Sequence, residues 1–234
     1  MISFIIPAHN EEQLLGRTLM SVSRVAEEIG ESFEVLVVDD ASTDRTAEVA
    51  REHGARVVPV QHRQIAKTRN SGAREAKGDV FIFVDGDTEP TVEVVRAALE
   101  ALRNGAVGGG CGVRFDGPVP LAAQIPTTML MYGSRYLKLA CGCFVFAKRG
   151  AFEACGGFDE TLFAAEEWAV SQRLKRVGQF VVLKEQVITS ARKLRTHSAW
   201  EILSLLGKVA LLGPKVLRKR EGLELWYGER RVER

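Results

Sequence analysis

Long apolar segments and cysteine motifs are both missing from the sequence. No apolar run approaches the roughly 20 residues that a membrane-spanning helix needs. No signal peptide is expected either, because the apolar stretch from Phe4 to Ile6 runs straight into Pro7. The four cysteines show no paired CxxC spacing, and Cys141 and Cys143 would share one face of a strand as small buried thiols. Together these absences predict a cytoplasmic protein with reduced cysteines.

The chain as a whole also lacks a strong excess of charge. Its 234 residues are 46% hydrophobic and 26% charged, with a formal net charge of +2. These values are typical of a globular protein and too mild to indicate nucleic-acid binding. The distribution is uneven, because residues 184–234 hold twelve Lys and Arg against six Glu. Such a basic end fits a membrane surface or a phosphate-bearing partner, and equally a solvated basic face.

Glycine motifs that bind nucleotides are absent as well. The glycines within 107–115 do not match GxGxxG, and no Lys-Ser or Lys-Thr follows them. This pattern excludes a dinucleotide fingerprint or a P-loop at that position. We expect a bent or bulged strand there instead.

What the sequence does show is an alternation of β-rich runs and helical patterns over its first 90 residues. This alternation predicts an α/β fold, with a mostly parallel sheet, right-handed crossovers and helices on both faces. The expected strands are 2–6, 33–38, 56–60 and 80–84, and the expected helices start at Asn10, at Ser42 or Thr43, and at residue 65. Further along, we expect helices near 91–103, 121–139 and 163–177 and a strand at 142–147.

Polar residues follow three of the predicted strands at the point where each strand ends. They are the stretch from Pro7 to Glu11, the pair Asp39-Asp40, and the turn Asp85-Gly86-Asp87. Ligands of open α/β sheets bind beyond the carboxyl ends of the strands. Because unpaired polar groups are costly inside a protein, three such clusters at one sheet edge predict a binding site.

The turn at Asp85-Gly86-Asp87 is the candidate metal site. Two carboxylates with a glycine between them can both face one hard cation, and Mg²⁺ or Mn²⁺ prefers oxygen ligands of this kind. Substrate phosphates commonly complete the coordination of Mg²⁺. The apolar run Val-Phe-Ile-Phe-Val just before the turn strengthens this interpretation.

Four motifs, in this order and spacing, resemble the family 2 glycosyltransferases. They are Ile-Pro-Ala-His-Asn-Glu-Glu, Val-Val-Asp-Asp-Ala-Ser-Thr-Asp-Arg-Thr, Arg-Asn-Ser-Gly-Ala and Phe-Val-Asp-Gly-Asp-Thr. The resemblance covers about residues 2–185 and is most specific in the first 90. It implies a GT-A-like fold, a nucleotide-sugar donor, a divalent cation and inversion at the anomeric carbon of the sugar.

The same resemblance assigns donor-binding residues. Asp39 matches the residue that hydrogen-bonds the base, which favours a UDP-sugar and leaves a GDP-sugar open, while Asp40 can equally be a turn residue that flanks a helix. Arg69 can meet phosphate or form a surface ion pair. The implied donor-binding set is Pro7, Ala8, Glu11, Asp39, Arg69, Asp85 and Gly86.

The pair Glu166-Glu167 resembles the family's later acidic pair, in which Asp is common at the second position. Inverting transfer needs a carboxylate that takes the proton of the acceptor hydroxyl, and Glu167 is the expected base, with Glu166 as the other candidate. A purely structural interpretation is that both carboxylates favour the macrodipole of the 163–177 helix.

The resemblance extends to a third metal ligand and to the division of the chain. His197 follows the acceptor region, where a third metal ligand is often found, and would add to Asp85 and Asp87. A lone histidine is more often structural. We expect a domain over 1–197, with a nucleotide-sugar half at 1–90 and an acceptor half at 91–197. An amphipathic, basic helical tail at 198–234 either packs on this domain or lies on the inner face of a membrane.

The sequence thus predicts a metal-dependent inverting glycosyltransferase with an unidentified hydroxyl acceptor, for which a lipid-linked molecule and a polysaccharide are candidates. Two alternatives stay open. A sugar nucleotidyltransferase would favour a glycine-rich loop that residues 7–16 lack, and a non-catalytic nucleotide- or carbohydrate-binding module would have little need of a complete metal turn.

Overall fold

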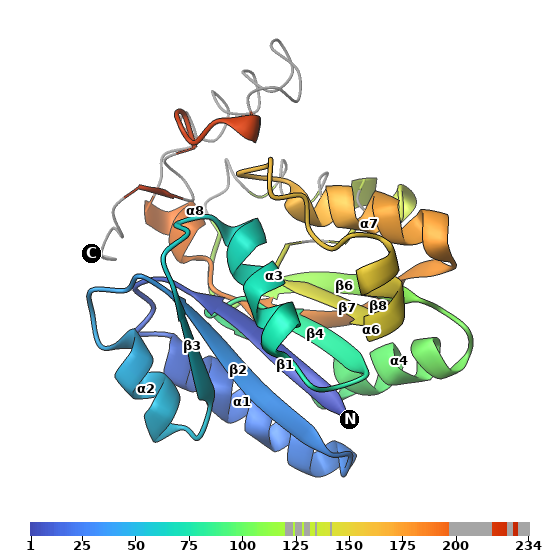
Figure 1. The fold of residues 1–234 in the computed structure, drawn as a ribbon, viewed down its shortest axis with the longest axis horizontal. Coiled ribbons are helices and arrows are strands. Elements are labelled where there is room, and N and C mark those ends of the chain that lie inside the picture. The colour runs from blue at the N-terminus through green and yellow to red at the C-terminus, as the bar shows by residue number, and fades with distance from the viewer. Residues whose placement is uncertain are drawn as a thin grey trace.

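The computed structural model describes residues 1–119, 124, 128, 132–133, 135–140, 142–196, 217–223 and 227–228. Over these residues the chain forms an eight-stranded sheet with helices on both faces (Figure 1). The strand order is β3-β2-β1-β4-β7-β6-β8-β5. The strands are β1 (Ile2–Ala8), β2 (Phe33–Asp40), β3 (Arg56–Val60), β4 (Val80–Val84), β5 (Thr88–Glu89), β6 (Gly108–Phe115), β7 (Phe144–Lys148) and β8 (Phe180–Thr189).

The two halves of the sheet differ in strand direction. β3, β2, β1 and β4 are all parallel, as the alternation predicts. β7 then runs antiparallel to both of its neighbours, β4 and β6, while β6 and β8 are parallel. The α/β fold with two covered faces is therefore confirmed, and the sheet is mixed because its second half does not continue the β-α-β repeat.

Two groups of helices cover the two faces (Figure 1). α1 (Leu15–Ile29), α2 (Thr46–Glu52) and α4 (Val92–Arg103) pack on one face, and α3 (Ile65–Glu75), α6 (Arg149–Ala154) and α7 (Glu166–Val177) pack on the other. β4 shows how one strand serves both cores, because Ile82 and Val84 join the first and Phe81 and Phe83 join the second. The short helix α8 (Arg192–Thr196) follows β8.

The first two loops differ from the sequence prediction. Asn10 does not cap α1, which begins at Leu15 without a side-chain cap. Instead the side-chain oxygen of Asn10 accepts from the Thr43 backbone N–H at 2.8 Å, and its own N–H donates to the Ser42 hydroxyl at 3.0 Å. These contacts tie the loop after β1 to the loop after β2, and α2 starts only at Thr46.

Other features of the sheet agree only in part with the sequence prediction. The expected bulge is confirmed as a register shift between Gly110 and Gly112 in β6. β1 continues through Pro7, which is tolerated because β4 pairs with β1 only as far as Ile5. The sequence pattern did not predict β5, β8 or α6. Most of the expected 121–139 helix and of the 198–234 tail lies outside the described residues, and none of the described helices is long and apolar enough to cross a membrane.

Gly72 in α3 carries a testable consequence of this packing. An added Cβ would fall 2.7 Å from Cγ2 of Val38 and even closer to Cγ2 of Ile5. We therefore expect Gly72→Ala to lower the free energy of unfolding by about 1–3 kcal/mol, because α3 must move off the sheet. Urea denaturation followed by circular dichroism measures the change.

Gly150 provides the matched control. It is also helical, it is exposed, and nothing lies within 4 Å of an added Cβ. Gly150→Ala should stabilise the protein by about 0.4–1 kcal/mol through the unfolded chain. A Gly72→Ala variant as stable as the Gly150→Ala variant would contradict this account of how α3 packs.

Candidate functional site

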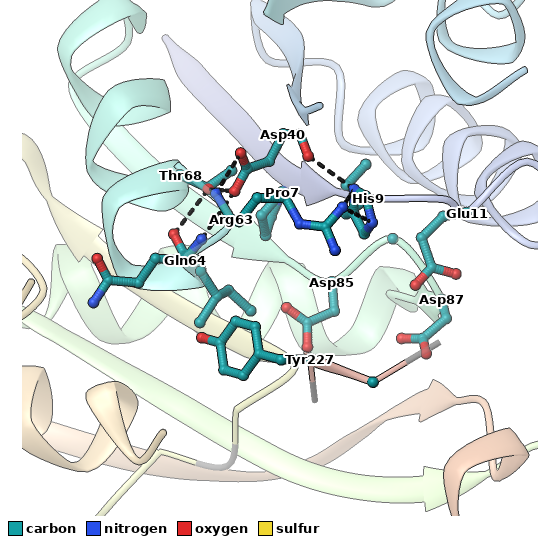
Figure 2. A pocket seen from close by; sticks show the side chains of 14 residues that line it. Pro7, His9, Glu11, Asp40, Arg63, Gln64, Thr68, Asp85, Asp87 and Tyr227 are labelled. Atoms are coloured by element: carbon teal, nitrogen blue, oxygen red, sulfur yellow. Dashed lines mark hydrogen bonds between the residues drawn. The ribbon is translucent and has the colours of Figure 1, made fainter. Parts of the chain in front are cut away.

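A pocket opens at the carboxyl ends of β1, β2 and β4, where the sequence predicts the binding site (Figure 2). All three polar clusters contribute to it. The second cluster contributes Asp40, and Asp39 is not among the lining residues. The lining residues are Pro7, Ala8, His9, Glu11, Asp40, Arg63, Gln64, Ile65, Thr68, Asp85, Gly86, Asp87, Tyr227 and Gly228.

Asp40 fixes the loop that leads into α3. Its carboxylate accepts from the backbone N–H groups of His62 at 2.6 Å, Arg63 at 2.8 Å and Gln64 at 3.1 Å, and from the Thr68 hydroxyl at 2.7 Å. Four donors leave this buried carboxylate little capacity for a ligand. The geometry supports the interpretation of Asp40 as a residue that flanks a helix.

The Asp39 carboxylate accepts fewer of the described hydrogen bonds than that of Asp40 does. One of its oxygens accepts from the Ser42 backbone N–H at 3.2 Å, and the residue is only partly buried. Its assignment as the contact to the base stays a prediction.

Arg69 is the most heavily bonded side chain of the site. Its Nη1 donates to Glu166 at 3.0 Å and to Glu167 at 2.7 Å, and its Nη2 donates to Asp85 at 2.7 Å and to the Gly142 carbonyl at 2.9 Å. The residue is 1% exposed, so the alternative of a surface ion pair is wrong. Burial acts to lower its pKa, but Asp85 and the two glutamates outweigh burial and raise the pKa.

These contacts join α3 to the end of β4 and to the first turn of α7. The neighbouring Asn70 adds a second link, because its amide exchanges two 3.0 Å hydrogen bonds with the backbone of Phe158. The Arg69 guanidinium also lies 5.2 Å from the centre of the Phe158 ring. The Arg-Asn motif therefore ties the first 90 residues to the second half of the chain, and Arg69 is committed to carboxylates rather than to phosphate.

The Glu166-Glu167 pair sits behind Asp85, outside the lining of the pocket. Burial and the neighbouring Glu167 raise the pKa of Glu166 well above its usual range. Burial acts to raise the pKa of Glu167 too, but the charge and hydrogen bond of Arg69 outweigh burial and lower it. The pKa values of the two adjacent carboxyls thus shift in opposite directions, so Glu166 holds a proton more readily than Glu167 does.

Acidic residues also surround the proposed metal turn. Arg192 of α8 donates to Glu11 at 2.7 Å and lies 3.8 Å from the Asp87 carboxylate, while Asp85 carries the contact to Arg69. Figure 2 shows the Glu11 and Asp87 carboxylates near each other beside Asp85. Carboxylate oxygens at the rim of a pocket fit Mg²⁺ or Mn²⁺ chemically.

The metal site is not complete within the described residues. There, no group of three or more His, Cys, Asp or Glu side chains is arranged to hold a metal ion. His197, the expected third ligand, lies outside the described residues. Asp85 and Asp87 stay predicted ligands, and bound phosphate would have to supply further oxygens.

Several pocket residues were not identified from the sequence. Arg63 and Gln64 come from the short loop before α3, and His9 lies inside the first polar cluster without having been singled out. Tyr227 comes from the predicted tail, and its hydroxyl donates to the Phe163 carbonyl at 2.8 Å. The only sequence signal for Tyr227 is an aromatic residue in a basic segment, which does not reveal where the segment packs.

Known sequences include a matching family and relatives that are similar to this chain over part of their length. The model of glycosyl transferase family 2 matches residues 3–154. A dolichol-phosphate mannosyltransferase from Pyrococcus furiosus is 36% identical over 110 residues, which cover 45% of this chain and 31% of that protein. An undecaprenyl-phosphate 4-deoxy-4-formamido-L-arabinose transferase from Edwardsiella ictaluri is 33% identical over 115 residues, which cover 44% of this chain and 34% of that protein. The match therefore spans well under two thirds of either relative.

Solved structures confirm the GT-A-like fold. A mannosyltransferase from Pyrobaculum calidifontis in complex with GDP-Man and Mn²⁺ superposes with a TM-score of 0.71 at 22% identity, over 94% of this chain and 65% of that chain. Residues 1–349 of S. aureus TarS in complex with UDP-GlcNAc give a TM-score of 0.64 at 16% identity, over 96% and 78% of the two chains. Because the family model covers more than half of the sequence, the chain belongs to glycosyl transferase family 2.

Proposed function

We propose that the protein transfers a sugar from a nucleoside-diphosphate sugar to an acceptor hydroxyl, with inversion and with a divalent metal. The observation that carries this proposal is the arrangement around Arg69, which joins Asp85 at the pocket rim to the Glu166-Glu167 pair. The proposed metal ligand Asp85 and the proposed base Glu167 thus contact the same buried guanidinium. Membership of family 2 favours this reaction over nucleotidyl transfer.

The donor side of the proposal rests on the pocket between Asp40 and Asp87. UDP-sugars and GDP-sugars are both candidates, since the structural neighbours are complexes with GDP-Man and with UDP-GlcNAc. Asp85 and Asp87 would hold Mg²⁺ or Mn²⁺ against the diphosphate. Once bound there, the metal would neutralise the charge that develops on the departing diphosphate.

A lipid-linked acceptor is the version that we favour. Two relatives are named for dolichol-phosphate and undecaprenyl-phosphate. In this chain Arg218, Lys219 and Arg220 are exposed on the segment that leads to Tyr227 at the pocket. Exposed basic residues next to a donor site suit an anionic membrane surface, so we propose peripheral contact there.

Glu167 is the base that the electrostatics favour. A general base must be ionised before it can accept a proton, and Glu167 keeps a lowered pKa while that of Glu166 is raised. Glu167 is also the more accessible of the two, with 12% of its side chain exposed against 3% for Glu166. Attack by the deprotonated acceptor on the side opposite the diphosphate gives inversion.

Metal-dependent nucleotide binding is the first test. Calorimetric titration of UDP and of GDP, with Mn²⁺ and again with EDTA, should show one of them binding tightly only with the metal. In Asp87→Ala the gain in nucleotide affinity that Mn²⁺ provides should fall by at least about tenfold, or ~1.4 kcal/mol, because a metal ligand is lost.

Glu89→Ala serves as the control for the Asp87 variant. Glu89 lies just beyond the same turn and forms an ion pair with Arg17, yet it does not line the pocket. It should bind nucleotide like the parent protein. Equal Mn²⁺-dependent binding by Asp87→Ala and Glu89→Ala would remove Asp87 from the metal site, and binding of both nucleotides without any turnover would favour a binding module.

The choice of base gives a second test. Glu167→Gln should keep nucleotide binding but slow donor turnover by about 10²–10⁴-fold, because the proton acceptor is lost. The measurement is release of nucleoside diphosphate from the donor, in the presence of polyprenyl phosphate in micelles.

Glu166→Gln is the matched variant one residue away. The raised pKa of Glu166 favours its protonated form, which glutamine resembles, so this variant should keep turnover and be at least as stable as the parent protein to urea. Loss of turnover in Glu166→Gln with turnover retained in Glu167→Gln would assign the base to Glu166.

A further inference from the structure

We propose that Arg63, held in place by His9, binds the diphosphate of the donor; this inference rests on the proposed function. Arg63 is the only Arg or Lys among the residues that line the described pocket. Figure 2 shows its side chain reaching across the pocket towards His9, between Asp40 and Asp85. A cation in this position faces the space between the nucleotide loops and the proposed metal turn.

The charge of Arg63 is not matched by an acidic partner in the described part of the chain. Its guanidinium contacts the ring of His9, at 3.2 Å from Nδ1 and closer still to Nε2. Arg69 and Arg192, by contrast, are bonded to carboxylates at 2.7–3.0 Å. A guanidinium has five N–H donors in a planar fork that matches phosphate oxygens, so Arg63 retains both charge and donors for an anion.

His9 has a defined role in holding this side chain. Its Nδ1 lies 2.8 Å from the Asp40 carbonyl, which can only accept, so Nδ1 carries the proton. Nε2 is then left with a lone pair that accepts from Nη1 of Arg63. The ring thus directs the guanidinium without placing a negative charge beside it.

The backbone of Arg63 is fixed as tightly as its side chain. Its N–H donates to the Asp40 carboxylate at 2.8 Å, and its φ of 49° lies in the left-handed region that few side chains adopt. Asp40 thus positions Arg63 in two ways. The Asp40 carboxylate binds the Arg63 backbone directly, and the Asp40 carbonyl binds His9, which contacts the Arg63 side chain. A strained residue held by its surroundings at the wall of a pocket is typical of a preorganised ligand contact.

The test compares ligands that differ only in phosphate. Calorimetric titrations of UDP, UMP and uridine, or of the guanosine series if GDP is the tighter ligand, are made on the full chain with Mn²⁺. Arg63→Asn is the variant of choice, because asparagine tolerates a left-handed φ. Its affinity for the diphosphate should fall by about 10- to 100-fold while that for the nucleoside stays unchanged.

His9 is tested as a positioning residue. His9→Phe keeps a ring but loses the acceptor, and should weaken diphosphate binding severalfold without changing nucleoside binding. His9→Gln, which can still offer an acceptor to Arg63, should restore part of the loss. Arg74→Gln, on α3 but outside the pocket, is the control and should bind all three ligands like the parent protein.

Each outcome separates this inference from the proposed function. If the parent protein binds the diphosphate and Arg63→Asn binds it equally well, the inference is wrong and the proposed function stands. An equal loss of diphosphate and nucleoside in Arg63→Asn would overturn it too, by assigning Arg63 to the base or to the loop. If the parent protein binds neither nucleotide with Mn²⁺, both the proposed function and this inference fail.

Discussion

The burial of Arg69 among three carboxylates is the constraint on which the site depends. A lone carboxylate or guanidinium in this position would be costly, and each group is tolerated only because the others are present. The four side chains come from α3, from the end of β4 and from the start of α7, so correct assembly of the cluster requires both halves of the chain. Within the described residues, Arg69 Nε is the one buried side-chain polar atom without a hydrogen-bond partner, which indicates that charge pairing rather than ideal geometry fixes this side chain.

The three arginines around the pocket have different partners. Arg69 forms an ion pair with Glu167 behind Asp85. Arg192 forms ion pairs with Glu11 and Asp87 at the rim of the pocket. Arg63 faces the same space with an imidazole as its neighbour. An anionic ligand brings negative charge into a pocket already lined by acidic residues, so it needs cations on more than one side, and the proposed metal turn and Arg63 lie on different sides of that space.

Much of the fold could be predicted because its signals are local. The uninterrupted apolar run of β4 marks a strand covered on both faces, and polar residues at three strand ends mark the pocket edge. The reversed direction of β7 could not be predicted, since an apolar pattern carries no strand direction. The burial of Arg69 could not be predicted for a similar reason. Its partners Glu166 and Glu167 are 97 and 98 residues away, and nothing near it in the sequence indicates burial. Asp40, likewise, gains three of its four donors from residues 22–24 positions later.

Gly142 explains how the site accommodates glutamate at position 167, where the family resemblance leads us to expect aspartate. A Cβ at Gly142 would lie 2.8 Å from the Glu167 carboxylate, and the Gly142 carbonyl accepts from Arg69 at 2.9 Å. The longer side chain therefore fits because the facing residue has no side chain, and it still reaches the guanidinium. Because the raised pKa of Glu166 favours its neutral form, Asp85 and Glu167 are the carboxylates that carry the negative charge facing the single charge of Arg69. The remaining negative charge reaches solvent at Asp85, the more exposed of the two, which is where the pocket would bind a cation.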